Sequence, residues 1–221
     1  MSETWLLLSP LARRAYFNQA ADVAAAELKS VLGVESRPET RGNLDFLVPE
    51  QSPSADTSTA RLSFVQALFE VSDEPLQLAP RTLNPMWHLP EGFTHGVSYT
   101  GKTNEMVTQL ALNLALAHCQ LRGREAHYLL DPMAGQGTSL LWAARYGINS
   151  VGIETRRECL ERLHAHVRKQ SKLSRTSHKS QTGFAGGKRH SNPFRQVDFT
   201  DSSLRLINGD AREADKLHKK R

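Results

Sequence analysis

The residues best suited to chemistry lie between Tyr128 and Glu154, in the sequence YLLDPMAGQGTSLLWAARYGINSVGIE. Asp131 and Glu154 each follow a short apolar run, and Gly135 and Gly137 lie between them. Glycine can adopt positive φ, and its lack of a Cβ lets the backbone approach a ligand at the start of a helix. An acid at the end of a second strand can bind two ribose hydroxyls. This spacing predicts a nucleotide-type binding site.

A strand, a helix and a second strand must position these residues. Residues 128–130 are apolar and stop at Asp131, and a glycine-rich loop over 132–138 follows. Leu140, Leu141 and Ala144 form one apolar helix face, and Gly147 is placed to end that helix. The second strand covers residues 151–153, so the segment predicts a βαβ unit.

The glycines alone do not identify the ligand, because a nicotinamide dinucleotide site would use the same geometry. Leu140 stands where that pattern has its third glycine, and Asp131 suits a ligand with an amino group. DPMAGQGT resembles the first motif of class I S-adenosylmethionine-dependent methyltransferases. More narrowly, it is similar to the DPxxGxGT variant of RNA methylases with an N-terminal RNA-binding module, which include tRNA guanosine methyltransferases. The resemblance covers about residues 95–215.

The resemblance implies a Rossmann-like α/β domain that binds S-adenosyl-L-methionine. Asp210, in the sequence NGDA after a third strand over 204–207, resembles the acid that accepts from the adenine amino group; a plain turn is its alternative role. Thr103 and Asn104 could donate to the cofactor carboxylate, or Thr103 could be a plain helix N-cap. The residues that the resemblance assigns to cofactor binding are Asp131, Pro132, Ala134, Gly135, Gly137, Thr138, Glu154, Asp210, Ala211, Thr103 and Asn104.

A second nucleotide motif competes with this interpretation. Residues 96–103, GVSYTGKT, match the GxxxxGKT loop that binds phosphates in nucleoside triphosphatases. That loop needs a buried strand directly before its first glycine, and residues 88–95 contain Pro90 and Gly92 and little apolar content. A P-loop nucleotide hydrolase is therefore the less favoured alternative.

The N-terminal part predicts a small α+β module over residues 1–74. Strands are expected at 5–8, around Val34, at 44–48 and at 64–71. A helix should begin after Ser9, run to Leu32 and stop at Gly33, and a short helix is expected near Ala60. The order βαββαβ is that of a ferredoxin-like module. A proline-containing connector over 75–95 should separate it from the partial methyltransferase domain over 96–221.

Positive charge is concentrated near the C-terminus of a chain whose net charge is +5. Residues 168–200 are expected to form a basic insertion, since eight basic residues and no acid occur between Arg168 and Arg195. This pattern predicts contact with RNA, with tRNA implied by the resemblance, although a solvated, disordered face is the alternative. The candidate contacts are Arg168, Lys169, Lys172, Arg175, Lys179, Lys188 and Arg189.

No catalytic residue is assigned. The amine-methylating members of the resembling family have an (N/D)PPY-type motif after a fourth strand, and the sequence has only Asn192-Pro193-Phe194, which is interpreted as a turn before the third strand. We therefore expect half of a methyltransferase sheet, an exposed first strand, and a second chain as a possible source of the rest. A catalytically silent RNA-binding scaffold is the alternative function.

The composition argues against a membrane-spanning, an exported and a metal-binding protein. No apolar run is long enough to span a bilayer, and the TWLLL segment has no basic residue before it. Cys119 and Cys159 lack partners at metal-ligand spacing, which predicts two buried thiols, a cytoplasmic location and no metal. His164 and His166 are expected at the surface.

Overall fold

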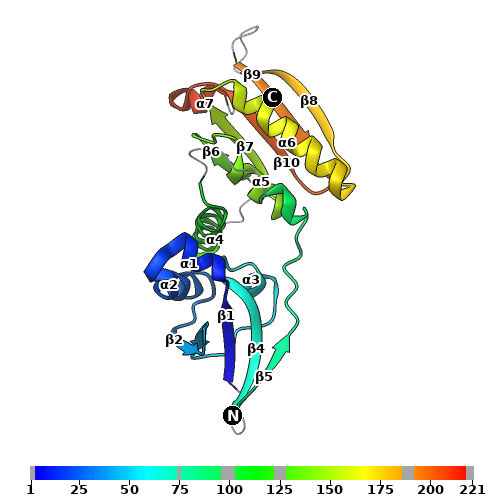
Figure 1. The fold of residues 1–221 in the computed structure, drawn as a ribbon. Helices are drawn as coiled ribbons and strands as arrows, with labels where there is room; N and C mark the ends of the chain where they lie inside the picture. The colour runs from blue at the N-terminus through cyan, green and yellow to red at the C-terminus, as the bar shows by residue number, and fades with distance from the viewer. Residues whose placement is uncertain (1–2, 74–75, 96–102, 122–127, 186–191, 218–221) are drawn as a thin grey trace. The chain divides into compact units, whose positions relative to one another are not determined.

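The computed structural model describes residues 3–73, 76–95, 103–121, 128–185 and 192–217. The chain is a mixed α/β protein that divides into two compact units, Met1–Met86 with Met106–Arg124, and Trp87–Glu105 with Glu125–Arg221. Each unit holds one five-stranded sheet, the first antiparallel and the second mixed (Figure 1). Among the described residues, no helix is long and apolar enough to cross a membrane.

The first sheet has the strand order β2-β3-β1-β4-β5. Its strands are β1 (Glu3–Leu8), β2 (Ser36–Arg41), β3 (Leu44–Pro49), β4 (Val65–Asp73) and β5 (Leu76–Arg81). The helical elements are α1 (Pro10–Tyr16), η1 (Phe17–Gln19), α2 (Ala20–Leu32) and α3 (Thr57–Ala60). The predicted order βαββαβ is therefore confirmed for the elements before β5. Leu6, Leu28, Leu47, Phe64 and Leu68 are buried in one core between helices and sheet.

The long N-terminal helix differs from its prediction in the middle. It begins and ends as expected: the Ser9 side chain accepts from the backbone N–H of Leu11, and Gly33 adopts φ 71 and donates to the Lys29 carbonyl. A 3-10 turn at Phe17–Gln19 divides it into α1 and α2. Asn18 in this turn has low helix propensity, because its side chain competes for backbone hydrogen bonds.

The sequence did not predict β5, because its residues do not alternate between buried and exposed positions. All six of its residues are exposed, and Pro80 is tolerated because β5 is an edge strand. The segment expected as a connector from residue 75 thus begins with a strand of the first sheet. The strand expected around Val34 begins two residues later, at Ser36.

α4 (Glu105–Leu121) does not bury its most regular apolar positions. Val107, Leu110, Ala111 and Leu114 recur at helical spacing, but none of them is buried and Leu114 is 38% exposed. The buried face instead carries polar residues, because Gln109 donates to the Arg61 carbonyl at 2.8 Å and Asn113 donates to Glu27 at 2.6 Å. From Met106 onward the helix therefore belongs to the first unit, although residues from 96 were assigned to the second domain.

The second sheet has the order β6-β7-β10-β9-β8. Strands β6 (Tyr128–Asp131), β7 (Asn149–Glu154) and β10 (Ser203–Asn208) are parallel, and β9 (Asn192–Asp198) and β8 (Lys179–Ala185) extend the sheet as an antiparallel hairpin. The helices are α5 (Thr138–Arg145), α6 (Glu158–Ser174) and α7 (Ala214–Leu217), with short turns η2 (Glu91–Phe93) and η3 (Ala211–Glu213). Both α5 and α6 contribute to one core cluster with Leu204 and Leu206, so they cover the same face (Figure 1).

The basic insertion expected over 168–200 is an ordered extension of the fold in its described part. Residues 168–174 complete α6, and β8 and β9 follow. The prediction failed because β8 is a polar edge strand without apolar alternation. Gly183 lies over the Phe194 ring, where a Cβ would come within 2.8 Å of ring carbons, so glycine allows the aromatic ring to cover the strand.

Asn192-Pro193-Phe194 begins β9 and is not the predicted turn. Pairing of β9 with β10 ends at Phe194, so the missing N–H of Pro193 removes no hydrogen bond from that side of the ladder. Tyr128 and Leu130 on β6 are each 40% exposed. β6 is the edge strand of the described sheet, as predicted.

Candidate functional site

The candidate site lies where the three parallel strands end. The register pairs Asp131 with Gly152 and Asn208 with Glu154, so the C-terminal ends of β6, β7 and β10 meet at one edge of the sheet. Ligands of open α/β sheets bind outside the carboxyl ends of the strands. The structure therefore brings together the Asp131–Thr138 loop, Glu154 and the segment after β10.

The loop between β6 and α5 is fixed by contacts with its neighbours. The Ala134 N–H donates to the Ile153 carbonyl at 3.0 Å, and a Cβ on Gly152 would lie 2.5 Å from the Ala134 Cβ. Gly152 is therefore required for the close approach of the loop to β7. Asp131 holds the loop from the other side, because it accepts from the Met133 N–H and the Ser139 hydroxyl.

Gly135 and Gly137 have the conformations that the sequence predicted. Their φ angles are 54° and 80°, which only glycine adopts without strain. A Cβ on Gly135 would meet no atom within 4 Å, so this part of the loop faces open space. A Cβ on Gly137 would lie 3.0 Å from Leu163, so Gly137 is needed for packing against α6. The two glycines thus have different roles.

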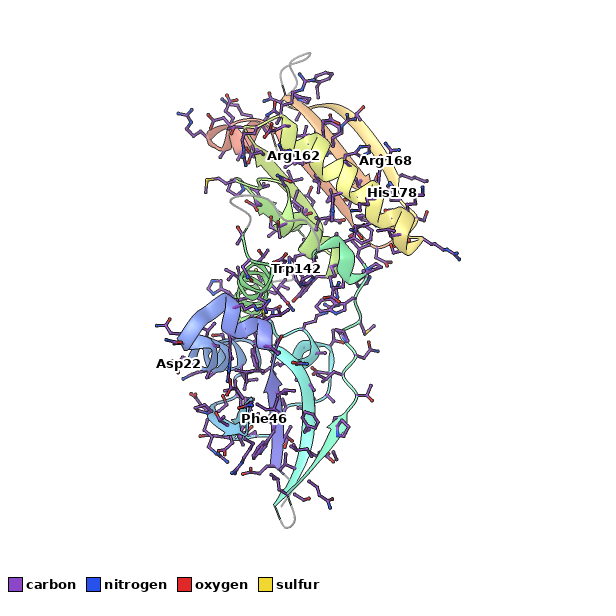
Figure 2. The ribbon with its side chains drawn as sticks, viewed as in Figure 1. Asp22, Phe46, Trp142, Arg162, Arg168 and His178 are labelled. Carbon is purple, nitrogen blue, oxygen red and sulfur yellow. The ribbon has the colours of Figure 1, made fainter. Side chains whose placement is uncertain are left out.

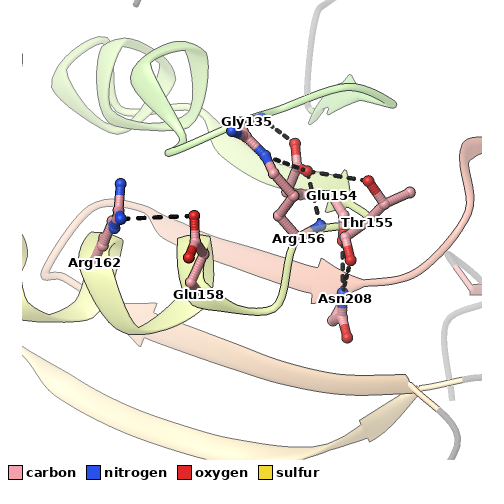
Figure 3. Close-up of polar contacts among 7 residues, drawn as sticks. All are labelled: Gly135, Glu154, Thr155, Arg156, Glu158, Arg162 and Asn208. Atoms are coloured by element: carbon pink, nitrogen blue, oxygen red, sulfur yellow. Dashed lines mark hydrogen bonds and ion pairs between the residues drawn. The ribbon is translucent and has the colours of Figure 1, made fainter. Parts of the chain in front are cut away.

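Glu154 links the loop to the start of α6 (Figure 3). Its Oε2 accepts from the Gly135 N–H at 3.0 Å, and its Oε1 accepts from the Arg156 N–H at 2.8 Å. The side chain is only 10% exposed. Burial opposes ionisation of the carboxyl, but the hydrogen bonds from Arg156 and from the Thr155 hydroxyl outweigh it, and the pKa of Glu154 lies below its usual range. Glu154 is therefore an anion at neutral pH.

Asn208 joins the ends of β7 and β10, and the sequence did not single out this role. Its Nδ2 donates to the carbonyls of Glu154 and Thr155 at 2.9 and 2.7 Å (Figure 3). The Gly209 N–H also donates to the Glu154 carbonyl, at 3.0 Å. The only sequence feature that could have indicated this role is the position of Asn208, at the end of an apolar strand and directly before a glycine. The contact of the Ser139 hydroxyl with Asp131 was not predicted either, because serine is common in the first turn of a helix and gives no specific signal.

Asp210 lies at the same edge but is engaged locally. Its side chain caps η3 by accepting from the Arg212 N–H at 2.9 Å, and both of its oxygens accept from the Arg212 guanidinium. The hydrogen bonds from Arg212 lower the pKa of Asp210 to about 2. This geometry matches the alternative role of Asp210 as a turn former, and adenine recognition by Asp210 and Ala211 stays a prediction.

The remaining predicted residues are placed as follows. Pro132 and Thr138 flank the loop, with Thr138 as the first residue of α5. Thr103 and Asn104 directly precede α4, whose residues from Met106 belong to the first unit, so their contact with a cofactor stays a prediction. Of the GxxxxGKT motif, residues 96–102 lie outside the described part of the chain.

The predicted basic contacts lie on two elements. Arg168, Lys169 and Lys172 are exposed on α6, Arg175 caps that helix, and Lys179 begins β8. Lys188 and Arg189 lie outside the described residues. Nothing in the described segments forms a cluster of three or more metal-ligating side chains. Cys159 is buried as predicted, whereas Cys119 is partly exposed, and both are free thiols.

No protein-family model matches this chain, and no curated protein is significantly similar to it.

Proposed function

We propose that the second unit is the cofactor-binding part of a class I methyltransferase domain and binds S-adenosyl-L-methionine. The observation that carries the proposal is the convergence of the Asp131–Thr138 loop, Glu154 and the Asn208–Asp210 segment at one sheet edge. The order β6-β7-β10, with α5 and α6 on one face, supports a Rossmann-like half sheet.

The residues present fit this cofactor. Open space beside Gly135 lets the loop backbone lie against an adenosine, and Glu154 supplies an anionic acceptor for ribose hydroxyls. Asp131 can also accept a hydrogen bond from the amino group of the methionine part. Its carboxylate has about four acceptor positions, and only two of them are used by the Met133 N–H and the Ser139 hydroxyl. Bound S-adenosylmethionine would supply an electrophilic methyl group. The protein residues bind and orient the donor.

The substrate proposed is a base in RNA, with tRNA as the favoured class. The order β2-β3-β1-β4 within a βαββαβ module supports a ferredoxin-like fold for the first unit, and such modules present RNA in the methylases that this chain resembles. The exposed basic residues of α6 and β8 supply charge for phosphate contacts.

Replacement of Glu154 should weaken binding of the methyl donor. A hydrogen bond to a charged group contributes about 1.5–3 kcal/mol, so Glu154→Ala should raise the dissociation constant for S-adenosylmethionine about 10- to 150-fold. Glu154→Gln should give an intermediate loss, because it keeps one acceptor oxygen and removes the charge. Calorimetric titration of the three proteins measures the effect.

Glu158→Ala is the matched control. Glu158 is an exposed acid in the first turn of α6 and lies 3.6 Å from Arg162, away from the loop (Figure 3). Its removal should leave donor affinity unchanged. Wild-type affinity in a Glu154→Ala protein with an unchanged unfolding transition would contradict the assignment of Glu154.

A further inference from the structure

A basic pocket lies between the second half of α6 and the start of β8. Its volume is about 530 Å³, and its wall includes Arg168, Lys172, His164 and His178. Figure 2 labels Arg168 and His178 in this region. The seven lining residues, all from α6, β8 and the turn between them, carry cationic, imidazole or hydroxyl groups and no carboxylate.

The pocket is shaped by the chain reversal after α6. His164, Arg168 and Lys172 recur at every fourth position, so they share one helix face, while Leu163 and Val167 are buried in the core. Arg175 adopts φ 56 and ends the helix, and the Thr176 N–H then donates to the Ser171 carbonyl at 3.0 Å.

A hydrogen bond across the pocket fixes the distance between helix and strand. The His164 Nε2 lies 3.3 Å from the Ser180 Oγ, and β8 pairs with β9 along its whole length. The start of β8, in the segment expected to be an insertion, therefore forms one side of an open surface pocket.

The electrostatics favour an anion. Within the described part of the chain, neither Arg168 nor Lys172 forms an ion pair. Burial and the positive charges of Arg195 and Arg168 lower the pKa of His164, and the acidic Glu161 only partly opposes them. The negative end of the α6 dipole stabilises these cations but opposes a bound anion, so the basic side chains alone do not establish a site.

Ser171 supplies the independent observation. The residue lines the pocket but is only 5% exposed, and its Oγ is buried without a hydrogen-bond partner among the described residues. A buried hydroxyl left unpaired is unfavourable. The Oγ itself is shielded from the pocket, so a ligand oxygen reaches it only when the neighbouring side chains shift, and the serine hydroxyl can then donate to an anionic oxygen.

We propose that this pocket binds a phosphate group. The Arg168 guanidinium, the Lys172 ammonium and the hydroxyls of Ser171, Thr176 and Ser180 hold it. The arginine matches the geometry of phosphate oxygens, and lysine adds a point charge. The phosphate is a backbone diester of nucleic acid or a free phosphomonoester.

The pocket is separate from the proposed methyl-donor site. α6 begins near Glu154 and runs back along the parallel strands, so Arg168 lies about 15 Å of helix rise beyond Glu158. S-adenosylmethionine contains no phosphate, so the pocket is not part of the donor site. Only the identification of RNA as the source of the phosphate rests on the proposed function.

The test titrates the full chain with inorganic phosphate, uridine monophosphate and a short oligouridylate. Imidazole NMR signals of His164 and His178 report occupancy directly. Arg168→Ala should weaken binding of the preferred probe about 10- to 100-fold, and Ser171→Ala should weaken it less. Lys216→Ala is the control, because it removes one positive charge from an exposed position of α7 that does not line the pocket and is not among the predicted RNA contacts.

The outcomes are distinguishable. If Arg168→Ala weakens binding of the oligouridylate alone, the pocket binds backbone diesters. If it weakens binding of uridine monophosphate and of phosphate equally, the pocket binds a monoester. Equal effects of Lys216→Ala and Arg168→Ala, or histidine signals that no probe shifts, would overturn the proposal. All these variants should bind S-adenosylmethionine with the affinity of the wild type. Failure of the phosphate proposal would therefore leave the methyltransferase assignment separately testable.

Discussion

Purified residues 1–221 should transfer no methyl group to RNA above the background of a reaction without protein. Methyl transfer needs the acceptor held in line with the donor, and orientation of this kind contributes about 7–11 kcal/mol to rate acceleration. The (N/D)PPY-type motif that orients amines in the resembling enzymes is absent from the sequence. Its nearest likeness, Asn192-Pro193-Phe194, is built into β9.

Transfer of a radiolabelled methyl group from S-adenosylmethionine to total RNA, and to tRNA, measures this prediction. Donor binding by the same preparation is the positive control, since the donor site does not depend on an acceptor. Robust transfer would contradict the expected layout. Asn192 would then be the first residue to replace, although its Nδ2 is engaged with the Asn208 carbonyl at 3.0 Å.

Glu27→Ala should strongly destabilise the first unit. Glu27 is 1% exposed, and its carboxyl accepts from the Ser63 N–H and hydroxyl and from the Asn113 amide, joining α2, α4 and the segment before β4. Removal takes the carboxylate acceptor away from two buried N–H groups, at about 1–3 kcal/mol each, so the free energy of unfolding should fall by about 2–6 kcal/mol. Urea unfolding in mildly acidic buffer measures the loss.

Glu35→Ala is the control for this substitution. Glu35 is exposed and pairs with Lys29 at 2.5 Å on the surface, where ion pairs contribute about 0–1 kcal/mol. Equal unfolding transitions for the Glu27→Ala and Glu35→Ala proteins would show that the buried network adds no stability.

The same carboxyl predicts a pH dependence of stability. Burial raises the pKa of Glu27, and hydrogen bonds from Ser63 and Asn113 only partly oppose this. A raised folded-state pKa means that the protonated carboxyl stabilises the fold below its ordinary pKa of 4.5, and that this contribution is lost as pH rises through the raised value. Glu27→Gln cannot ionise, so the stability of the wild type relative to this variant should decrease with rising pH. A relative increase would show that the folded state prefers the charged form.

Elements with strong periodicity or clear end signals were predictable. β6, α5, β7 and β10 follow the expected order, because each apolar run is bounded by an acid, a glycine or an asparagine that stops it. Ser9 and Gly33 likewise fixed the ends of the first helical segment. These signals are local, so the sequence contains them in full.

The failures occurred where tertiary contacts replace local pattern. α4 buries Gln109 and Asn113 because their amides find partners on other elements, which hydrophobic periodicity does not detect. β5 and β8 are exposed edge strands whose stability comes from pairing with β4 and β9.

Binding of S-adenosylmethionine by the second unit is best measured by calorimetric titration of the wild-type chain with S-adenosylmethionine, its demethylated product, and ATP with magnesium. We expect saturable binding of the methyl donor and its product at one site, weakened by Glu154→Ala and unchanged by replacement of the lysine of the GxxxxGKT motif, Lys102→Ala. Tight binding of magnesium and ATP that Lys102→Ala abolishes, with no binding of the methyl donor, would contradict the proposed donor site and favour the P-loop alternative.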